Sequence, residues 1–206
     1  MRTVRGRLLV ALAAGMSVIQ ACGDDGAYNA GDAGTDTDTD TDTDGDSDAG
    51  AGPDCADVWQ DSASGLYWAL LPSGDGTMSW QAAADYCDAL TLCGHGDWRL
   101  PTIGELRSVV RGCPATVTGG ACGATDACHT ADCWNTGCDG CAFDEGPDEG
   151  CYRPTEIEGS CAAAWSSTDD GEDGTSAWEV AFRAGSVIEE IMTYLDAGAR
   201  CVHSGP

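Results

Sequence analysis

The sequence predicts an α+β domain in which two helices pack against short antiparallel strands. Two segments, 79–90 and 101–110, place apolar residues on one helical face directly after a residue that can cap a helix. A third segment, 176–190, alternates apolar and polar residues on either side of an Ala-Gly turn, as a hairpin does. The helices precede a run of strands instead of alternating with them, and this order is typical of the α+β class.

The first strand and the first helix follow from local signals. A turn at Ser64-Gly65 leads into an aromatic and apolar run that ends at Leu71, which predicts a strand. Ser79 then provides the N-cap of the first helix. The face of this helix that we expect to be buried consists of Trp80, Ala83, Ala84, Cys87 and Leu90.

The remaining elements lie on both sides of a long insert. Thr102 and Glu105 have the spacing of a capping box, so a second helix begins there, and we expect it to end near Gly112. The hairpin at 176–190 follows the insert, and the stretch 198–203 predicts a short closing strand.

The insert, residues 113–161, holds eight cysteines among glycine, alanine, threonine and aspartate. It shows no helix or strand pattern, so we expect disulfides to replace the apolar core that it lacks. Cys138 and Cys141, with Cys128, His129 and Cys133 nearby, also have the composition of a zinc site. Disulfides are favoured over zinc because the chain carries the signs of export described next.

The first 21 residues have the layout of an export signal. Three arginines precede an apolar run, 8–19, that is too short to span a membrane, and Ala21 comes just before Cys22. Residues 18–22 resemble the lipobox of bacterial lipoproteins, which implies cleavage before Cys22 and acylation of that cysteine. The alternative is an ordinary secretory signal. With Cys22 as the lipid carrier, the 13 cysteines leave an even twelve for disulfides.

Residues 22–54 then form the lipidated cysteine and an aspartate-rich tether. The segment alternates Thr and Asp and contains no basic residue, so it buries too little apolar surface to fold, and its like charges extend it. We therefore expect an exported protein that is lipid-anchored to the bacterial outer membrane or cell surface and carries one folded head at 55–206.

The charge of the chain narrows its partners. The formal net charge is −26 and there is no lysine. Such a surface repels phosphate backbones and anionic lipid surfaces, so we expect no nucleic-acid binding and membrane contact through the lipid anchor only. Neutral glycans, cationic groups, divalent metal ions and other proteins remain as partners.

We expect no cofactor, and the alternative is calcium. Four carboxylates share a glycine-containing loop: Asp169, Asp170, Glu172 and Asp173. The alternative for this loop is a solvated run of charges. Residues 40–48 also alternate Asp as a calcium loop does, but the twelfth position of that pattern, Ala51, lacks the glutamate that such a loop needs.

Trp134 and Asn135 in the insert are candidate ligand-binding residues. An aromatic side chain held in a disulfide-stapled loop can stack on a sugar, although Trp134 can equally form a small core for the insert. No catalytic group is expected, because Ser166-Ser167 has no histidine placed by sequence to activate it. His95, in a Gly-His-Gly turn, is expected to be a surface residue.

A series of short motifs carries a family resemblance. In chain order they are GLYW, SWQAAADYCDAL, GDWRLPTIGELRSVV, AAWSSTD, AWEVAFRAGSV and ARCV. With these motifs, the segment from Asp61 to His203 resembles the Lcl C-terminal domain family, which is named for the C-terminal domain of a collagen-like adhesin. The family is similar in fold to C-type-lectin-like domains. The resemblance implies that the first helix meets the last strand, and that Cys87 and Cys201 in these elements form a disulfide.

The resemblance also implies a role in adhesion. The namesake's domain is associated with glycosaminoglycan binding, which needs a basic patch that this acidic head lacks, and the tripeptides of calcium-dependent sugar-binding lectins are missing. We predict a cell-envelope lipoprotein whose non-catalytic head binds a carbohydrate or a protein at the cell surface. One alternative is an enzyme, because the Arg-Leu-Pro-Thr block at 99–102 resembles that of the formylglycine-generating enzyme family. The other is a purely structural envelope protein.

Overall fold

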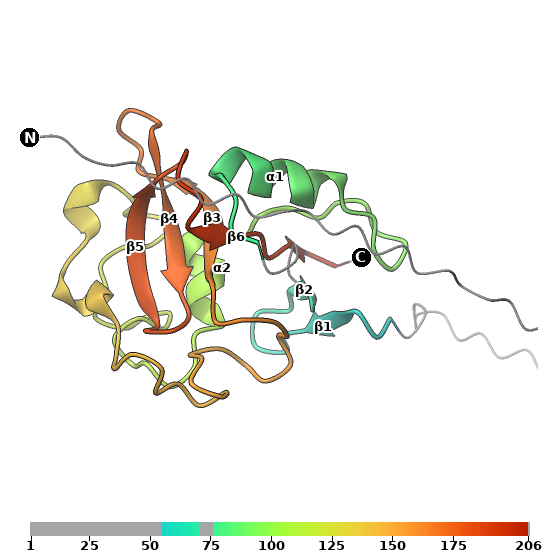
Figure 1. The fold of residues 1–206 in the computed structure, drawn as a ribbon, viewed down its shortest axis with the longest axis horizontal. Helices are drawn as coiled ribbons and strands as arrows, with labels where there is room; N and C mark the ends of the chain where they lie inside the picture. The colour runs from blue at the N-terminus through green and yellow to red at the C-terminus, as the bar shows by residue number, and fades with distance from the viewer. Residues whose placement is uncertain (1–54, 71–75, 206) are drawn as a thin grey trace, which may run out of the picture. The chain divides into compact units, whose positions relative to one another are not determined.

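The structure is a computed structural model that describes residues 55–70 and 76–205. The predicted export signal, the lipidated Cys22 and the tether, including the aspartate repeat at 40–48, lie outside the described residues. Within them, the predicted α+β class is confirmed, with two α-helices and two small sheets (Figure 1). None of the helices in this part of the chain is long and apolar enough to cross a bilayer.

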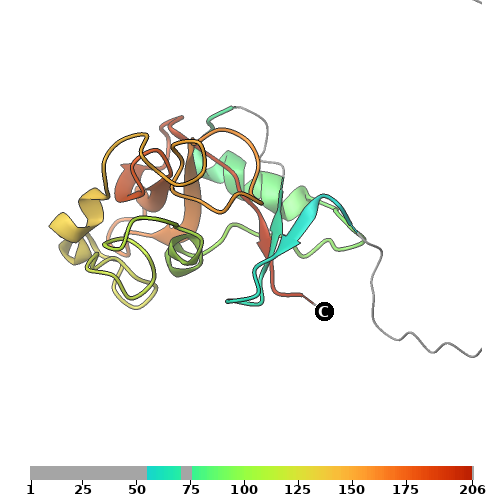
Figure 2. The same ribbon diagram turned by 90° about the horizontal axis from the view of Figure 1, so that it is seen from below.

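The first sheet joins the start of the domain to its end. Its strands are antiparallel in the order β1-β2-β7, and they comprise Val58–Gln60, Tyr67–Ala69 and Val202–His203. β2 is the strand predicted after the Ser64-Gly65 turn, where Gly65 adopts a left-handed φ of 77° that suits glycine. Tyr67 lies opposite His203, so the last strand runs alongside the first hairpin (Figure 2).

The second sheet has the strand order β5-β4-β3-β6. These strands comprise Ser186–Ile191 (β5), Ser176–Ala181 (β4), Ala163–Asp169 (β3) and Ala197–Gly198 (β6). β4 and β5 form the predicted hairpin. β6 pairs with β3 in parallel, which corrects the expectation of antiparallel strands only. The link 192–196 carries the chain back to the level where β3 begins, so β6 runs in the same direction as β3.

The predicted closing strand at 198–203 is divided between the two sheets. Its first residue belongs to β6 in the second sheet, whereas Val202 and His203 belong to β7 in the first. The chain changes sheet over residues 199–201, and a single strand cannot pair with both sheets at once. This crossing places the end of the domain beside the first helix.

The first helix, α1 (Trp80–Ala89), begins where the sequence predicts. The Ser79 hydroxyl accepts a hydrogen bond from the Ala82 N–H, which satisfies one of the free donors of the first turn. Its inner face buries Ala83 and Cys87, and Cys87 forms a disulfide with Cys201, the bridge that the resemblance implies.

The second helix, α2 (Ile103–Ser108), has the predicted capping box between Thr102 and Glu105. It ends at Ser108 and not near Gly112. The reason lies in tertiary contacts, because the Arg111 N–H donates to the Tyr152 carbonyl (3.0 Å) instead of to a helical carbonyl.

The insert is held together by disulfides, as expected. All eight of its cysteines pair with one another: Cys113–Cys141, Cys122–Cys138, Cys128–Cys133 and Cys151–Cys161. Cys138 and Cys141 therefore bond to different partners and not to each other, and no thiolate is left among these cysteines to bind zinc. Two 3-10 helices give the insert local structure, η1 (Ala131–Cys133) and η2 (Thr136–Asp139).

A buried arginine fastens the insert to the second helix. Arg107 is almost fully buried, and its guanidinium donates to the carbonyls of Thr116 and Val117, both at 2.9 Å, and to that of Ala124. Burial lowers the pKa of Arg107. These hydrogen bonds satisfy carbonyls that have no strand or helix partner, so the irregular start of the insert is tolerated in the interior.

Four tryptophans anchor two adjoining clusters of the core. Trp68 and Trp178 belong to the cluster around α2 and β4. Trp98 and Trp165 belong to the cluster around α1 and the Cys87–Cys201 bridge. Trp98 comes from the motif that carries the family resemblance, and its burial explains why this motif is structural.

Candidate functional site

A cleft separates the insert from the edge strand β5. Its volume is about 510 Å³, within the roughly 300–1,000 Å³ typical of small-molecule sites. The 3-10 helices of the insert stand beside β5 in Figure 1. The cleft is lined by Ala131, Trp134, Cys138 and Asp139 of the insert and by Ser186, Val187, Ile188 and Glu189 of β5.

A close backbone approach sets the width of the cleft. Gly140 follows η2 with a φ of 87° and a ψ of −146°, a conformation available essentially to glycine alone. The next N–H, that of Cys141, donates to the Ala184 carbonyl at 2.7 Å, and the Asp144 N–H donates to the Arg183 carbonyl at 2.8 Å. The insert is thus bonded to the β4–β5 turn, which holds its 3-10 helices beside β5.

Trp134 is the exposed aromatic side chain of this cleft. It is 44% exposed, whereas the four core tryptophans are almost completely buried. Its neighbour Asn135 does not line the cleft, and the Asn135 Oδ1 accepts a hydrogen bond from the Gly137 N–H at 2.8 Å. Of the two candidates predicted in the insert, Trp134 therefore lines the cleft, whereas Asn135 caps η2.

Two carboxylates, those of Asp139 and Glu189, also line the cleft. Burial raises the pKa of Glu189, and the neighbouring Asp170, Glu172 and Asp173 raise it further, against a hydrogen bond from Ser176. Glu189 therefore connects the cleft electrostatically to the acidic loop at 169–173.

The acidic loop uses three of its four carboxylates to hold its own backbone. Asp169 accepts from the Gly171 N–H (3.0 Å), and Asp170 accepts from the Glu172 N–H (3.2 Å). Asp173 accepts from the Thr175 N–H (3.0 Å) and hydroxyl (2.6 Å), which lowers its pKa. These are Asx-type turns, which form without an ion. Calcium binding by Asp169, Asp170, Glu172 and Asp173 stays a prediction.

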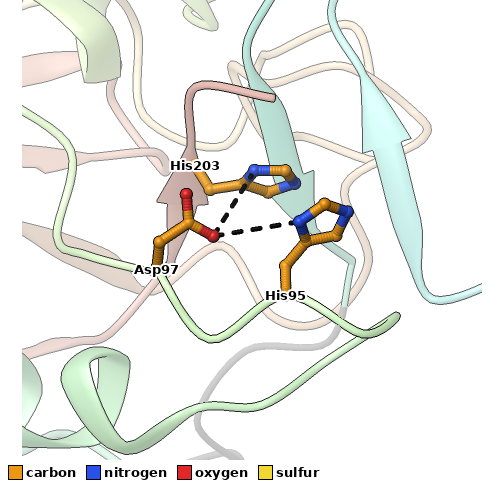
Figure 3. A group of neighbouring side chains, drawn as sticks. All are labelled: His95, Asp97 and His203. Carbon is orange, nitrogen blue, oxygen red and sulfur yellow. Dashed lines mark ion pairs between the residues drawn. The ribbon is translucent and has the colours of Figure 1, made fainter. Parts of the chain in front are cut away.

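The structure also brings together a group of polar residues that the sequence analysis does not predict. His95, Asp97 and His203 lie together at the edge of the first sheet, and Figure 3 shows both histidine rings facing the Asp97 carboxylate. The His95 side chain is partly exposed, as expected of a surface residue, and its ring stacks on that of His203. The sequence held one indication of this group. The disulfide that the resemblance implies, between Cys87 and Cys201, brings the segment that carries His95 close to the segment that carries His203.

Comparison with known proteins identifies the family of this domain. A comparison with curated proteins gave no match. The family model of the Lcl C-terminal domain matches residues 57–203, which include both helices, both sheets and the cysteine-rich insert. The chain therefore belongs to the Lcl C-terminal domain family.

Proposed function

We propose that the head binds a neutral carbohydrate in the cleft between the insert and β5, without catalysing a reaction. The observation that carries this proposal is the exposed indole of Trp134 in a cleft that also presents the Asp139 and Glu189 carboxylates. The indole offers an apolar face on which a sugar ring can stack, and the carboxylates can accept hydrogen bonds from sugar hydroxyls.

The charge of the cleft selects among carbohydrates. Both of its ionisable groups are acidic, and the acidic loop adds further negative charge beside Glu189. Sulfated and uronic acid polymers would be repelled, so the proposed ligand is a neutral carbohydrate. This differs from the glycosaminoglycan binding associated with the namesake of the family.

We also propose that the head lies outside the cell, anchored to the cell envelope by lipid. Six disulfides among the described cysteines indicate an exported or extracellular protein. We infer that Cys22 carries lipid and that the tether holds a C-type-lectin-like head away from the bacterial outer membrane or cell surface. A head at the end of such a tether can reach carbohydrates on a neighbouring surface, which is the geometry that adhesion requires.

A glycan array with the full chain and two matched variants tests the proposal. We expect Trp134→Ala to abolish binding, because it removes the stacking face. Tyr194→Ala is the control, since Tyr194 is similarly exposed (49%) but does not line the cleft, and binding should survive. Repeating the array with calcium and with a chelator shows whether a calcium ion bound by the loop at 169–173 takes part in glycan binding.

The outcomes separate the alternatives. Loss of binding in Trp134→Ala alone supports the cleft as the site. Binding that is equally affected by both variants places the ligand elsewhere on the head. If no glycan binds in either buffer, the carbohydrate proposal is wrong, and a protein partner or a structural role takes its place.

A further inference from the structure

Three side chains from two distant segments of the domain present ligand atoms to one another at the edge of the first sheet. The Nδ1 atoms of His95 and His203 lie 3.9 and 4.0 Å from Asp97 Oδ1, and the three ligand atoms are all within 4.8 Å of each other (Figure 3). We call these three residues the histidine cluster. It is the one such group of three His, Cys, Asp or Glu residues within 55–70 and 76–205.

The backbone beneath the histidine cluster is held from several sides. His95 and Leu92 exchange two backbone hydrogen bonds of 3.0 Å across the turn that carries His95. Arg99 pairs in the same way with Val202, the residue before His203. Disulfides fix both segments nearby, since Cys93 bonds to Cys55 and Cys201 bonds to Cys87. The cluster is therefore preorganised, as a binding site requires.

The His203 ring is packed among aromatic groups. It is 1% exposed and stacks between Tyr67 (4.8 Å between ring centroids) and His95 (4.4 Å), with the edge of Trp98 at 4.5 Å. Burial and the adjacent His95 lower the pKa of His203, while Asp97 opposes this shift. The packing therefore fixes the position of the imidazole beside His95 and Asp97.

A backbone hydrogen bond selects the tautomer of His203. The Gly205 N–H donates to His203 Nδ1 at 3.0 Å, so the ring proton resides on Nε2 and Nδ1 carries the lone pair. Nδ1 is the nitrogen that faces Asp97 in Figure 3. Gly205 follows the last pairing of the sheet, which joins Tyr67 to His203, so an incoming ion can replace its N–H without breaking a strand.

We propose that His95, Asp97 and His203 bind one divalent transition-metal ion of the zinc type through the two Nδ1 atoms and a carboxylate oxygen. Bonds of about 2.0–2.2 Å to each ligand put the ligand atoms roughly 3–3.5 Å apart. The observed distances to Asp97 Oδ1 therefore need to close by less than about 1 Å. The two histidine rings, which are stacked in this structure, also have to turn so that their ligand nitrogens, at most 4.8 Å apart, converge on the ion. Two imidazoles with one carboxylate suit zinc and its neighbours, whereas calcium prefers oxygen ligands alone.

The cluster is accessible to an ion from solvent. The Asp97 side chain is 64% exposed and that of His95 is 39% exposed, so only His203 lies deep. With three protein ligands, further coordination positions remain for water. The net charge of −26 also raises the local concentration of cations around the protein.

Calorimetric titration of the full chain with Zn²⁺ tests the proposal, using oxidised protein without a histidine tag. We expect one ion to bind per chain, and His95→Gln and Asp97→Asn to weaken binding by at least ~10-fold. The matched control is His129→Gln. His129 Nδ1 lies 3.9 Å from Asp169 Oδ1, the same separation as in the cluster, but no second histidine accompanies it. This variant should bind like the wild type.

Substitution of the buried His203 can disturb the fold, so NMR of the wild-type chain labelled with ¹⁵N-histidine provides the second measurement. Zn²⁺ should shift the Nδ1 resonances of His95 and His203 and leave those of His129 in place. The proposal is overturned if no ion binds, if His129→Gln weakens binding as much as His95→Gln, or if the two Nδ1 resonances do not move. Glycan binding in the cleft is independent of each of these results.

Discussion

At the scale of single residues, the most unusual carboxylate is Glu179 on β4. Its side chain is almost fully buried, and its Oε2 atom has no hydrogen-bond partner among the described residues. Burial raises the pKa of Glu179 to about 7, with further contributions from Glu190 and Asp196. Glu179 is therefore protonated in the folded protein over a pH range in which the unfolded chain is ionised.

This shift predicts a stability that depends on pH. The folded pKa lies above the unfolded value of 4.5, so the contribution of Glu179 is complete below pH 4.5 and is lost as the pH rises through about 7. We expect a loss on the order of 3 kcal/mol between pH 5 and pH 9 in the wild type. Glu179→Gln should remove this part of the pH dependence, as measured by urea denaturation at several pH values.

A surface glutamate provides the control for this measurement. Glu156 is exposed and near the end of the insert, so Glu156→Gln should keep the wild-type pH dependence. If Glu179→Gln and the wild type lose stability in parallel between pH 5 and pH 9, Glu179 is ionised in the folded state and the prediction is wrong.

At the scale of elements, the junction between the insert and the β4–β5 turn determines the shape of the cleft. Gly140 adopts a conformation that L-residues rarely reach, and a Cβ there would collide with the Ala184 carbonyl and approach the Ser186 nitrogen to 2.8 Å. Asp139 ends η2 directly before this junction, and Trp134 follows η1 a few residues earlier in the chain. The position of the insert thus depends on a residue without a side chain.

Substitution of this glycine should loosen the insert. We expect Gly140→Ala to lower the free energy of unfolding by roughly 3 kcal/mol, because it combines backbone strain with a steric collision. Gly119→Ala is the matched control in the same insert, since Gly119 also has a positive φ (79°) but open space around it. The control should lose only about 1 kcal/mol. If urea denaturation shows the same loss of unfolding free energy for both variants, the collision at Gly140 costs nothing and the prediction is wrong.

At the scale of the whole domain, the disulfides connect segments that the chain order separates. Cys87 and Cys201 are 114 residues apart, and their bond joins α1 to the crossing between the two sheets. The four bridges of the insert close loops of 28 residues or fewer. The long bridge therefore constrains the unfolded chain most, and it also supports the segment that carries His203.

Loop length predicts which bridge matters most for stability. Replacing Cys87 and Cys201 by alanine should cost about 4–5 kcal/mol through the entropy of the unfolded chain. Replacing Cys128 and Cys133, which are 5 residues apart, should cost about 2 kcal/mol. Denaturation of both double variants measures the difference. A larger loss from the short bridge would contradict the entropic argument.

The sequence predicts correctly those elements that depend on contacts between residues close together in the chain. The caps at Ser79 and Thr102 and the hairpin at 176–190 involve residues close in sequence, and the structure has them where the sequence predicts them. The predicted end of α2, near Gly112, is wrong because the Arg111 N–H donates to the carbonyl of Tyr152, which is far along the chain. The parallel pairing of β6 depends equally on the course of a distant link.

The sequence by itself determined the α+β class, the acidic character from which we expect no nucleic-acid binding, and the resemblance of the head to the Lcl C-terminal domain family. It also singled out Trp134, because an aromatic side chain in a disulfide-stapled loop can stack on a sugar. Only the tertiary structure decided that Trp134 lines a cleft with Glu189, and that His95 meets His203. Such meetings depend on backbone contacts between distant segments, and no local pattern of side chains encodes them.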